Sequence, residues 1–428
     1  MLALNSSIGL TQQLQNYSFD NSLYSKNELP SKNVDIFEKN KDVDISSQQA
    51  GRYNHEDAYS IEENINIPQI GDISIYGIYD GHRGDSAAKF LASEFGLSAI
   101  LISKLSHSIY PLNTDNIIQI FRESIIELQE RIPKNSGSTV VLVLIIKETG
   151  LTFNYTSGDC RWIYSNLDGD ILINSVREID FALETDIQRT GYLFNSIHQI
   201  NGDIVSKTDS VTKDKPLKVT EENLNLFYCD GDDNNKTSFK EWCAWNKSLN
   251  SNPSQIIKFP KKDSRCWRMP SGIHPTRSHG DGGMVCNFGV LSITKLKDPN
   301  NTILLMNCDG SEDNNSTNPY TLAKYSQNFK FAEDNFLKDH FCFKWSGVSD
   351  YDIPSDLDFL SQIKWIKSLF MGPLCKFDKD FQRSVDEAIE YFETHDVEFH
   401  NPSCEALVRY CQARLSGDNI TILKKHLV

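Results

Sequence analysis

Hydrophobic and polar residues follow two different periods along the chain. Short, β-rich apolar runs predict strands, and they lie at residues 72–79, 138–146, 151–155, 161–164, 171–174, 302–307 and 420–423. Apolar residues spaced three or four apart predict helices at 87–100, 118–132, 381–392 and 407–415. The strands and helices come in runs rather than in strict alternation, which favours an α+β fold with largely antiparallel sheets.

Turn signals connect the predicted strands between residues 138 and 174. Thr149-Gly150 separates the first two strands, and Asp168-Gly169 separates the last two. An Asp-Gly pair between apolar runs is among the strongest short-range signals of a β-hairpin. We therefore predict that this stretch is a meander.

Polar stretches without a sustained period mark the limits of the fold. Residues 1–45, rich in Ser, Asn, Gln and Lys, are predicted to be a disordered tail, and residues 46–428 are predicted to form one domain. A polar segment at about 200–270 is interpreted as an insertion in that domain. A second insertion, at about 320–400, is rich in aromatic residues and is expected to form packed helices.

Charge and composition exclude several classes of function. The 428 residues contain 43 Lys and Arg against 58 Asp and Glu, a net charge of −15, which argues against nucleic acid as a partner. The apolar runs are shorter than the roughly 18 residues of a membrane-spanning helix, and the first residues lack a targeting pattern. The ten cysteines form no Cys-x-x-Cys pair of the kind used by zinc or redox sites. We expect a cytoplasmic or nuclear protein that does not cross a membrane.

Four carboxylates stand at the edges of predicted strands: Glu56, Asp80, Asp309 and Asp418. Strand ends of a packed sheet can converge, and converging carboxylates repel one another unless a cation neutralises them. Oxygen ligands without cysteine or paired histidine favour Mg²⁺ or Mn²⁺ over zinc. An ordinary turn after a strand explains each Asp-Gly taken alone, so the metal hypothesis depends on the residues around them.

Seven short segments carry a resemblance to a known family. In chain order they are Arg52 with Glu56-Asp57, Asp80-Gly81-His82-Arg83-Gly84, Gly137-Ser138-Thr139, Ser157-Gly158-Asp159-Cys160-Arg161, Thr276-Arg277-Ser278-His279-Gly280-Asp281, Cys308-Asp309-Gly310-Ser311-Glu312-Asp313 and Ser416-Gly417-Asp418-Asn419-Ile420-Thr421. They resemble, in the same order, the motifs of the metal-dependent protein phosphatases, the type 2C serine/threonine phosphatases. No segment is specific alone, but together they resemble a divergent member of that family with insertions.

The resemblance implies a fold and a set of metal ligands. The fold would have four layers, an antiparallel β-sandwich flanked by α-helices on both faces. Two Mg²⁺ or Mn²⁺ ions would be held by the residues at the matching positions, which are Asp80, the carbonyl of Gly81, Asp309, Asp418 and, through a bound water, Glu56. A weaker third ion is implied near Asp180, although a salt-bridged loop aspartate is an equal alternative because the residues that follow do not match.

Two residues match the catalytic positions of the family. Arg52 would hold phosphate oxygens with its guanidinium fork, and His82 would act as the general acid that protonates the departing serine or threonine oxygen. The alternative for His82 is a structural histidine that caps the turn. Arg83 stands where the family has glycine, and it either adds a phosphate contact or blocks the substrate.

Other segments leave choices open. Cys229-Asp230-Gly231 competes with Asp309 for the ligand role, and Asp309 is favoured because Asp230 would leave residues 277–281 on the wrong side of the ligand. Ser311-Glu312 replaces an apolar-Trp pair of the family. A basic cluster lies where the family has a flap beside the catalytic cleft, and it is interpreted either as a solvated loop or as an element that attracts phosphorylated, acidic substrates: Lys258, Lys261, Lys262, Arg265 and Arg268.

The resulting hypothesis is a monomeric, Mg²⁺- or Mn²⁺-dependent hydrolase that removes phosphate from phosphoserine and phosphothreonine in signalling proteins. The alternative is a catalytically weak or inactive pseudophosphatase that binds or regulates phosphoproteins. A scaffold whose insertion at about 200–270 recruits a partner is compatible with either. The four carboxylates favour the enzyme, whereas Arg83 and the insertions favour the pseudophosphatase.

Overall fold

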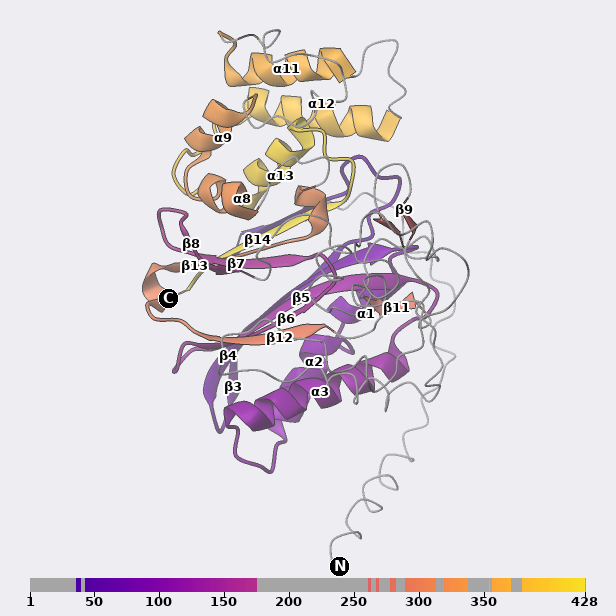
Figure 1. The fold of residues 1–428 in the computed structure, drawn as a ribbon, viewed down its shortest axis with the longest axis vertical. Coiled ribbons are helices and arrows are strands. Elements are labelled where there is room, and N and C mark those ends of the chain that lie inside the picture. Colours follow the sequence, from indigo (N-terminus) through magenta and orange to yellow (C-terminus); the bar gives the residue numbers. More distant parts are fainter. Residues whose placement is uncertain are drawn as a thin grey trace, which may run out of the picture. The chain divides into compact units, whose positions relative to one another are not determined.

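Two antiparallel sheets of six strands each form the centre of the unit Asp35–Val428 (Figure 1). The computed structural model describes residues 36–39, 43–174, 261–262, 267–268, 278–281, 289–312, 317, 319–337, 354, 356–370 and 379–427. A second unit, Met1–Val34, lies outside the described residues. All strand pairs within the described ranges are antiparallel, as the predicted α+β class requires.

Sheet 1 has the strand order β1-β2-β14-β13-β7-β8. Its strands are β1 (Ile36–Lys39), β2 (Val43–Gln48), β7 (Arg161–Ser165), β8 (Ile171–Asn174), β13 (Thr302–Asn307) and β14 (Ile420–Leu427). The last described strand, β14, pairs with β2 on one side and with β13 on the other. Segments from both ends of the described chain therefore meet inside this sheet.

Sheet 2 has the order β12-β6-β5-β4-β3, and the short strand β11 pairs with the start of β5. Its strands are β3 (Ala58–Ile67), β4 (Gly71–His82), β5 (Gly137–Ile146), β6 (Leu151–Ser157), β11 (His279–Gly280) and β12 (Val290–Lys295). A separate pair of two-residue strands joins β9 (Lys261–Lys262) to β10 (Trp267–Arg268).

The two sheets pack face to face, and their side chains alternate between two cores. On β5, Val141 and Val143 face sheet 1, whereas Val140 and Leu142 face the helices on the other side. All ten residues of β5 are buried. A strand that is covered on both faces reads as a continuous apolar run, which is why residues 138–146 were easy to predict as a strand.

Three helices cover the outer face of sheet 2: α1 (Ser86–Ala92), α2 (Leu97–Ser106) and α3 (Thr114–Arg131). The Asn113 side chain caps α3 by accepting a hydrogen bond from the Asn116 backbone N–H. Ser86–Ser106 is long and apolar enough to match a membrane-spanning helix, but it is divided into α1 and α2. Leu91 and Leu101 are fully buried in the core beneath sheet 2, so packing accounts for this composition.

On the outer side of sheet 1, the described residues form the helices α8 (Pro319–Tyr325), α9 (Phe329–Asn335), α11 (Phe359–Phe370), α12 (Lys379–Thr394) and α13 (Cys404–Ala413). α8 and α13 contact the sheet, and α11 packs on α12 farther out (Figure 1). An aromatic group joins them, in which Phe336 and Tyr410 meet edge to face. Short 3₁₀ helices stand at η5 (Pro299–Asn301) and η6 (Asp309–Ser311). Helices, two sheets and helices give four layers, which confirms the predicted architecture (Figure 1).

The predicted meander is correct only as far as β6. The hairpins at Thr149-Gly150 and Asp168-Gly169 are present, but β7 and β8 belong to sheet 1 rather than sheet 2. Gly158 has φ = 97°, a left-handed conformation that glycine adopts without strain, and it follows β6 directly. The chain turns there and crosses to the other sheet.

Several strands were not predicted from the sequence. β1 and most of β2 fall within or beside the segment 1–45, and β3 and β12 fall in stretches with weak alternation. The β3 sequence AYSIEENINI mixes polar residues into both faces because its outer half is partly exposed. Of the insertion at about 200–270, the structure describes only Lys261–Lys262 and Trp267–Arg268.

Candidate active site

Acidic side chains converge where strands of the two sheets end. Asp80 lies near the end of β4, Asp159 follows β6, and Asp309 begins η6 directly after β13. One carboxylate oxygen of each lies within 4.8 Å of the others. Asp80 also belongs to a second group with Asp57 and the sulfur of Cys308, again within 4.8 Å. Asp80 is therefore common to both groups.

Burial and the negative charges of neighbouring carboxylates raise the pKa values of Asp80 and Asp57. Burial, followed by the nearby charge of Asp309, raises the pKa of Asp80 well above its ordinary value. Burial also raises the pKa of Asp57 to about 7, and the charge of Asp418 adds to that effect. One oxygen of Asp57 accepts a hydrogen bond from the Thr421 hydroxyl at 2.6 Å. Its other oxygen has no hydrogen-bond partner within the described part of the chain.

This donor set suits a hard divalent cation. Clustered, buried carboxylate oxygens, one of them unsatisfied, are the ligands that Mg²⁺ and Mn²⁺ prefer. Burial raises the pKa of the Cys308 thiol well above its ordinary value, so the metal-free protein holds it as a neutral thiol. The thiol donates to the Asn419 carbonyl at 3.3 Å, and its sulfur accepts from the Thr421 N–H at 3.1 Å.

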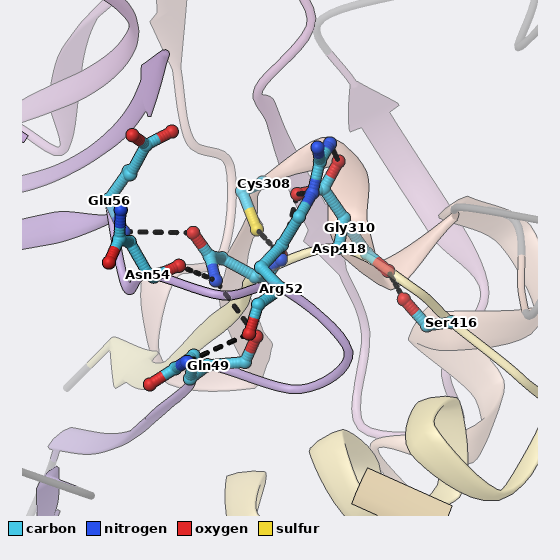
Figure 2. A network of polar contacts seen from close by, with 9 residues as sticks. Gln49, Arg52, Asn54, Glu56, Cys308, Gly310, Ser416 and Asp418 are labelled. Atoms are coloured by element: carbon cyan, nitrogen blue, oxygen red, sulfur yellow. Dashed lines mark hydrogen bonds and ion pairs between the residues drawn. The ribbon is translucent and has the colours of Figure 1, made fainter. Parts of the chain in front are cut away.

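Arg52 and Asp418 contact each other directly (Figure 2). The Arg52 Nε–H donates to Asp418 Oδ1 at 2.6 Å, and a terminal guanidinium nitrogen donates to Oδ2. The Arg52 side chain keeps 58% of its surface exposed, and that of Asp418 keeps 23%. The structure therefore brings together a predicted phosphate-binding residue and a predicted metal ligand. The Arg52 nitrogens that were predicted to contact phosphate donate to the Asp418 oxygens that were predicted to bind metal.

Asn419 positions the loop that carries Arg52 and Glu56. Its side-chain amide donates to the carbonyls of Gln49 at 2.8 Å and Asn54 at 3.0 Å, and its side-chain oxygen accepts from the Glu56 N–H at 2.8 Å. Figure 2 shows this loop curving around Arg52. Asn419 follows Asp418 in the chain, so one short segment supplies a candidate ligand and also anchors the loop.

Glu56 lies beside the end of β4. Its Oε1 accepts a hydrogen bond from the Gly84 N–H at 2.7 Å. A Cβ on Gly81 would lie 2.3 Å from the Glu56 carbonyl oxygen, so only glycine allows the two segments to approach this closely. Glu56 is thus near Asp80 along β4, although it is not a member of either group of converging ligand atoms.

His82 and Arg83 both face a buried aspartate, Asp281. His82 Nε2 lies 2.7 Å from Asp281 Oδ2, and an Arg83 terminal nitrogen lies 3.6 Å from Asp281 Oδ1. Arg83 has φ = 62°, a conformation that is uncommon for residues other than glycine. Arg83 therefore makes an ion pair within the protein at the position where it was expected either to bind phosphate or to block substrate.

Glu312 pairs with Arg161. The Arg161 Nε lies 3.7 Å from Glu312 Oε1, and the Asn307 amide donates to the same oxygen at 3.2 Å. Burial raises the pKa of Glu312, and the charge of Arg161 opposes that shift. This segment therefore carries an ion pair between two largely buried side chains.

Several candidates fall outside the described residues: Asp180, Asp230, Lys258 and Arg265. Lys261 lies opposite Arg268, and Lys262 lies opposite Trp267, in the β9-β10 pair. Asp57, Asp159 and Asp281 lie within the resembling segments, but the sequence alone indicates no role for them. The available signal was their position in those motifs, since each stands at a strand end or in a turn.

The fold and the site together define a class: an α+β four-layer sandwich with a buried acidic cluster, suited to divalent cations, where strands of both sheets end.

No protein-family model matches the sequence, and no curated protein matches it. Among solved structures, the chain is similar to a C. elegans sex determining protein, with 14% identity and a TM-score of 0.46 over 90% of this chain and 64% of that chain. It is similar to an S. agalactiae serine/threonine phosphatase, with 12% identity and a TM-score of 0.41 over 90% of this chain and 100% of that chain. It is also similar to a serine-threonine phosphatase 2C from Toxoplasma gondii, with 14% identity and a TM-score of 0.41 over 91% and 97% of the respective chains. The chain spans 64% of the length of the C. elegans protein. These likenesses concern the fold alone.

Proposed function

We propose that this protein is a metal-dependent phosphatase that hydrolyses phosphoserine and phosphothreonine in proteins. The observation that carries the proposal is the convergence on Asp80 of buried carboxylates whose charges oppose one another. His82 ends β4, the strand that carries Asp80, and Arg52 lies in the loop between β2 and β3, where it contacts Asp418. The seven ordered segments support the same assignment. Phosphorylated proteins are the partners that the proposal requires.

Mg²⁺ or Mn²⁺ would be held by the predicted ligands, which are Asp80, the Gly81 carbonyl, Asp309, Asp418 and Glu56. Asp57 and Asp159 would join them, because each has a carboxylate oxygen within 4.8 Å of an oxygen of Asp80. Bound divalent ions lower the pKa of water and offset the charge of a phosphoryl group. The planar fork of Arg52 matches two phosphate oxygens once it releases Asp418, and its exposed side chain leaves room for that change. His82 supplies the proton for the departing serine or threonine oxygen.

The proposal leaves three earlier expectations as predictions: two bound ions with a weaker third, a monomeric state, and a cytoplasmic or nuclear location. The substrate-binding role of Lys261, Lys262 and Arg265 is likewise a prediction.

Hydrolysis of a phosphothreonine peptide tests the proposed function. We expect turnover with Mn²⁺, none with a chelator, and a loss of roughly 10²–10³-fold in the Asp80→Asn variant, because Asp80 is shared by both ligand groups. Asp168→Asn, in the exposed β7-β8 turn, is the matched control and should retain full activity. Folded protein that binds Mn²⁺ without turning over the peptide would instead be the pseudophosphatase.

A further inference from the structure

Asp281 is fully buried, and two side chains contact the same oxygen of its carboxylate. Its Oδ2 lies 2.7 Å from His82 Nε2, a residue 199 positions away in the sequence. The Ser278 hydroxyl donates a hydrogen bond to the same oxygen. Arg83 lies 3.6 Å from the other oxygen, Oδ1. A carboxylate at this place thus holds the imidazole of His82 from one side.

Gly137 makes room for this contact. It lies opposite His82 in the β4-β5 register and opposite Gly280 in the β5-β11 register. A Cβ on Gly137 would lie 2.0 Å from Asp281 Oδ2 and 2.3 Å from His82 Nε2. Any other residue at position 137 would occupy the space in which the two side chains meet.

The backbone of β11 turns Asp281 toward His82. Residues two apart in a regular strand share a face, so Asp281 would point with His279 toward the helices. Gly280 has φ = 91° and Asp281 has φ = 54°, both outside the extended region. The Asp281 N–H nevertheless donates to the Ser136 carbonyl at 2.8 Å. The distorted backbone sends the carboxylate to the opposite face, where His82 lies.

His279 fixes β11 from the side of the helices. It lies 2.8 Å from the Tyr155 hydroxyl and contacts the Gln129 amide of α3. Burial lowers the pKa of His279 to about 3, so the ring is neutral at physiological pH. His279 therefore anchors β11 on the side of the helices. Asp281, the residue directly after β11, contacts His82 on the opposite side.

We infer that Asp281 is a positioning residue that orients the imidazole of His82 for proton donation, an inference that rests on the proposed phosphatase function. With the Nε2–H directed at Asp281, Nδ1 is the atom left to deliver a proton. That proton moves to the serine or threonine oxygen as its bond to phosphorus breaks. The oxygen of the attacking water becomes part of inorganic phosphate, and the proton that this water loses balances the one that His82 gives.

Two substrates with different leaving groups test the role of Asp281. An alkoxide leaving group needs the proton, whereas the p-nitrophenolate of p-nitrophenyl phosphate leaves without one. We expect Asp281→Asn to lower the ratio of kcat for a phosphothreonine peptide to kcat for p-nitrophenyl phosphate by roughly tenfold to a hundredfold, as His82→Gln does. Ser278→Ala should lower this ratio by about threefold. The control Asp168→Asn should not change it.

A spectroscopic readout separates positioning from stability. With Mg²⁺ bound and at a fixed pH, the proton NMR spectrum should contain a downfield ring N–H signal that disappears in both His82→Gln and Asp281→Asn. An unchanged ratio and an unchanged signal in folded Asp281→Asn would overturn the inference while leaving the proposed function intact. If Asp281→Asn does not fold, the same two measurements on Ser278→Ala decide, and no change in either overturns the inference.

The two proposals can fail separately. Wild-type protein that turns over neither substrate would overturn the proposed function. In that case the ring N–H signal still decides whether Asp281 holds His82, because it does not depend on turnover.

Discussion

Two buried carboxylate centres lie near the same end of β4, and they have opposite surroundings. Asp80 is surrounded by other acids, and burial and the charge of Asp309 raise its pKa. Asp281 is surrounded by donors, with His82 and Ser278 on one oxygen and Arg83 near the other. Asp80 is half-buried and Asp281 is fully buried, and the main difference between them is the charge of their neighbours. The first centre is suited to receive a cation, and the second is suited to hold a side chain.

The largest expected difference between the two centres is their response to metal. Saturating Mn²⁺ should raise the free energy of unfolding by about 3–4 kcal/mol when the ion is present at 100 to 1,000 times its dissociation constant. Asp80→Asn should abolish this gain, whereas Asp281→Asn should retain it. Urea unfolding with Mn²⁺ and with a chelator measures both. An equal loss of the gain in the two variants would show that the centres are not separate.

The next largest expected difference is the sign of the change in the free energy of unfolding that a substitution at each centre causes when a chelator has removed the metal. Asp281→Asn should lower the free energy of unfolding by about 1–3 kcal/mol, because it weakens the acceptor of the hydrogen bonds from His82 and Ser278. Asp80→Asn should raise it, because it removes one of several repelling buried charges. The same urea titrations give both values, with Asp168→Asn as the reference. Changes of the same sign in both variants would contradict the comparison.

The smallest expected effect is a pH dependence of the acidic centre. The pKa of Asp57 is about 7 when folded and near 3.8 when unfolded, so the folded state binds more protons over this range. Its stabilisation is complete below pH 3.8 and is lost as pH rises through 7. Chelated protein should therefore gain ~1 kcal/mol between pH 8 and pH 6.5.

Two histidines limit how far below pH 6.5 the effect of Asp57 can be measured on its own. Burial lowers the pKa of His55 to about 4 and that of His279 to about 3, so both oppose folding only below pH 6.5, where the unfolded state binds the proton. With Mn²⁺ bound the gain should vanish, because the ion takes the place of the proton. An identical pH slope with and without Mn²⁺ would rule out Asp57 as part of the metal-sensitive centre.

The sequence was most informative where local pattern decides structure. The continuous apolar run of β5 and the Asp-Gly turn after β7 could be predicted because strand burial and turn chemistry depend on neighbours in the chain. Asp80 and Asp309 were found for the same reason, since each directly follows or ends an apolar strand.

Long-range contacts were beyond local pattern. The Arg52–Asp418 pair joins residues 366 positions apart, and no periodicity indicates that they bond to each other. The contact between His82 and Asp281 depends on a two-residue strand with positive φ values, which is too short to produce a pattern. β7 enters sheet 1 after a turn at Gly158, whose φ of 97° gives no periodic signal in the sequence.

The place of β14 has a consequence for how the protein is made in the cell. β14 pairs with β2 and β13, and Asp418 and Asn419 stand immediately before it. A ribosome delivers this strand after every other described strand, so a nascent chain can complete sheet 2 and its helices while sheet 1 still lacks an interior strand. The loop that carries Arg52 and Glu56 lacks its Asn419 anchor until then. A chain that ends before Asp418 would therefore lack both this predicted metal ligand and the Asn419 anchor of the candidate site.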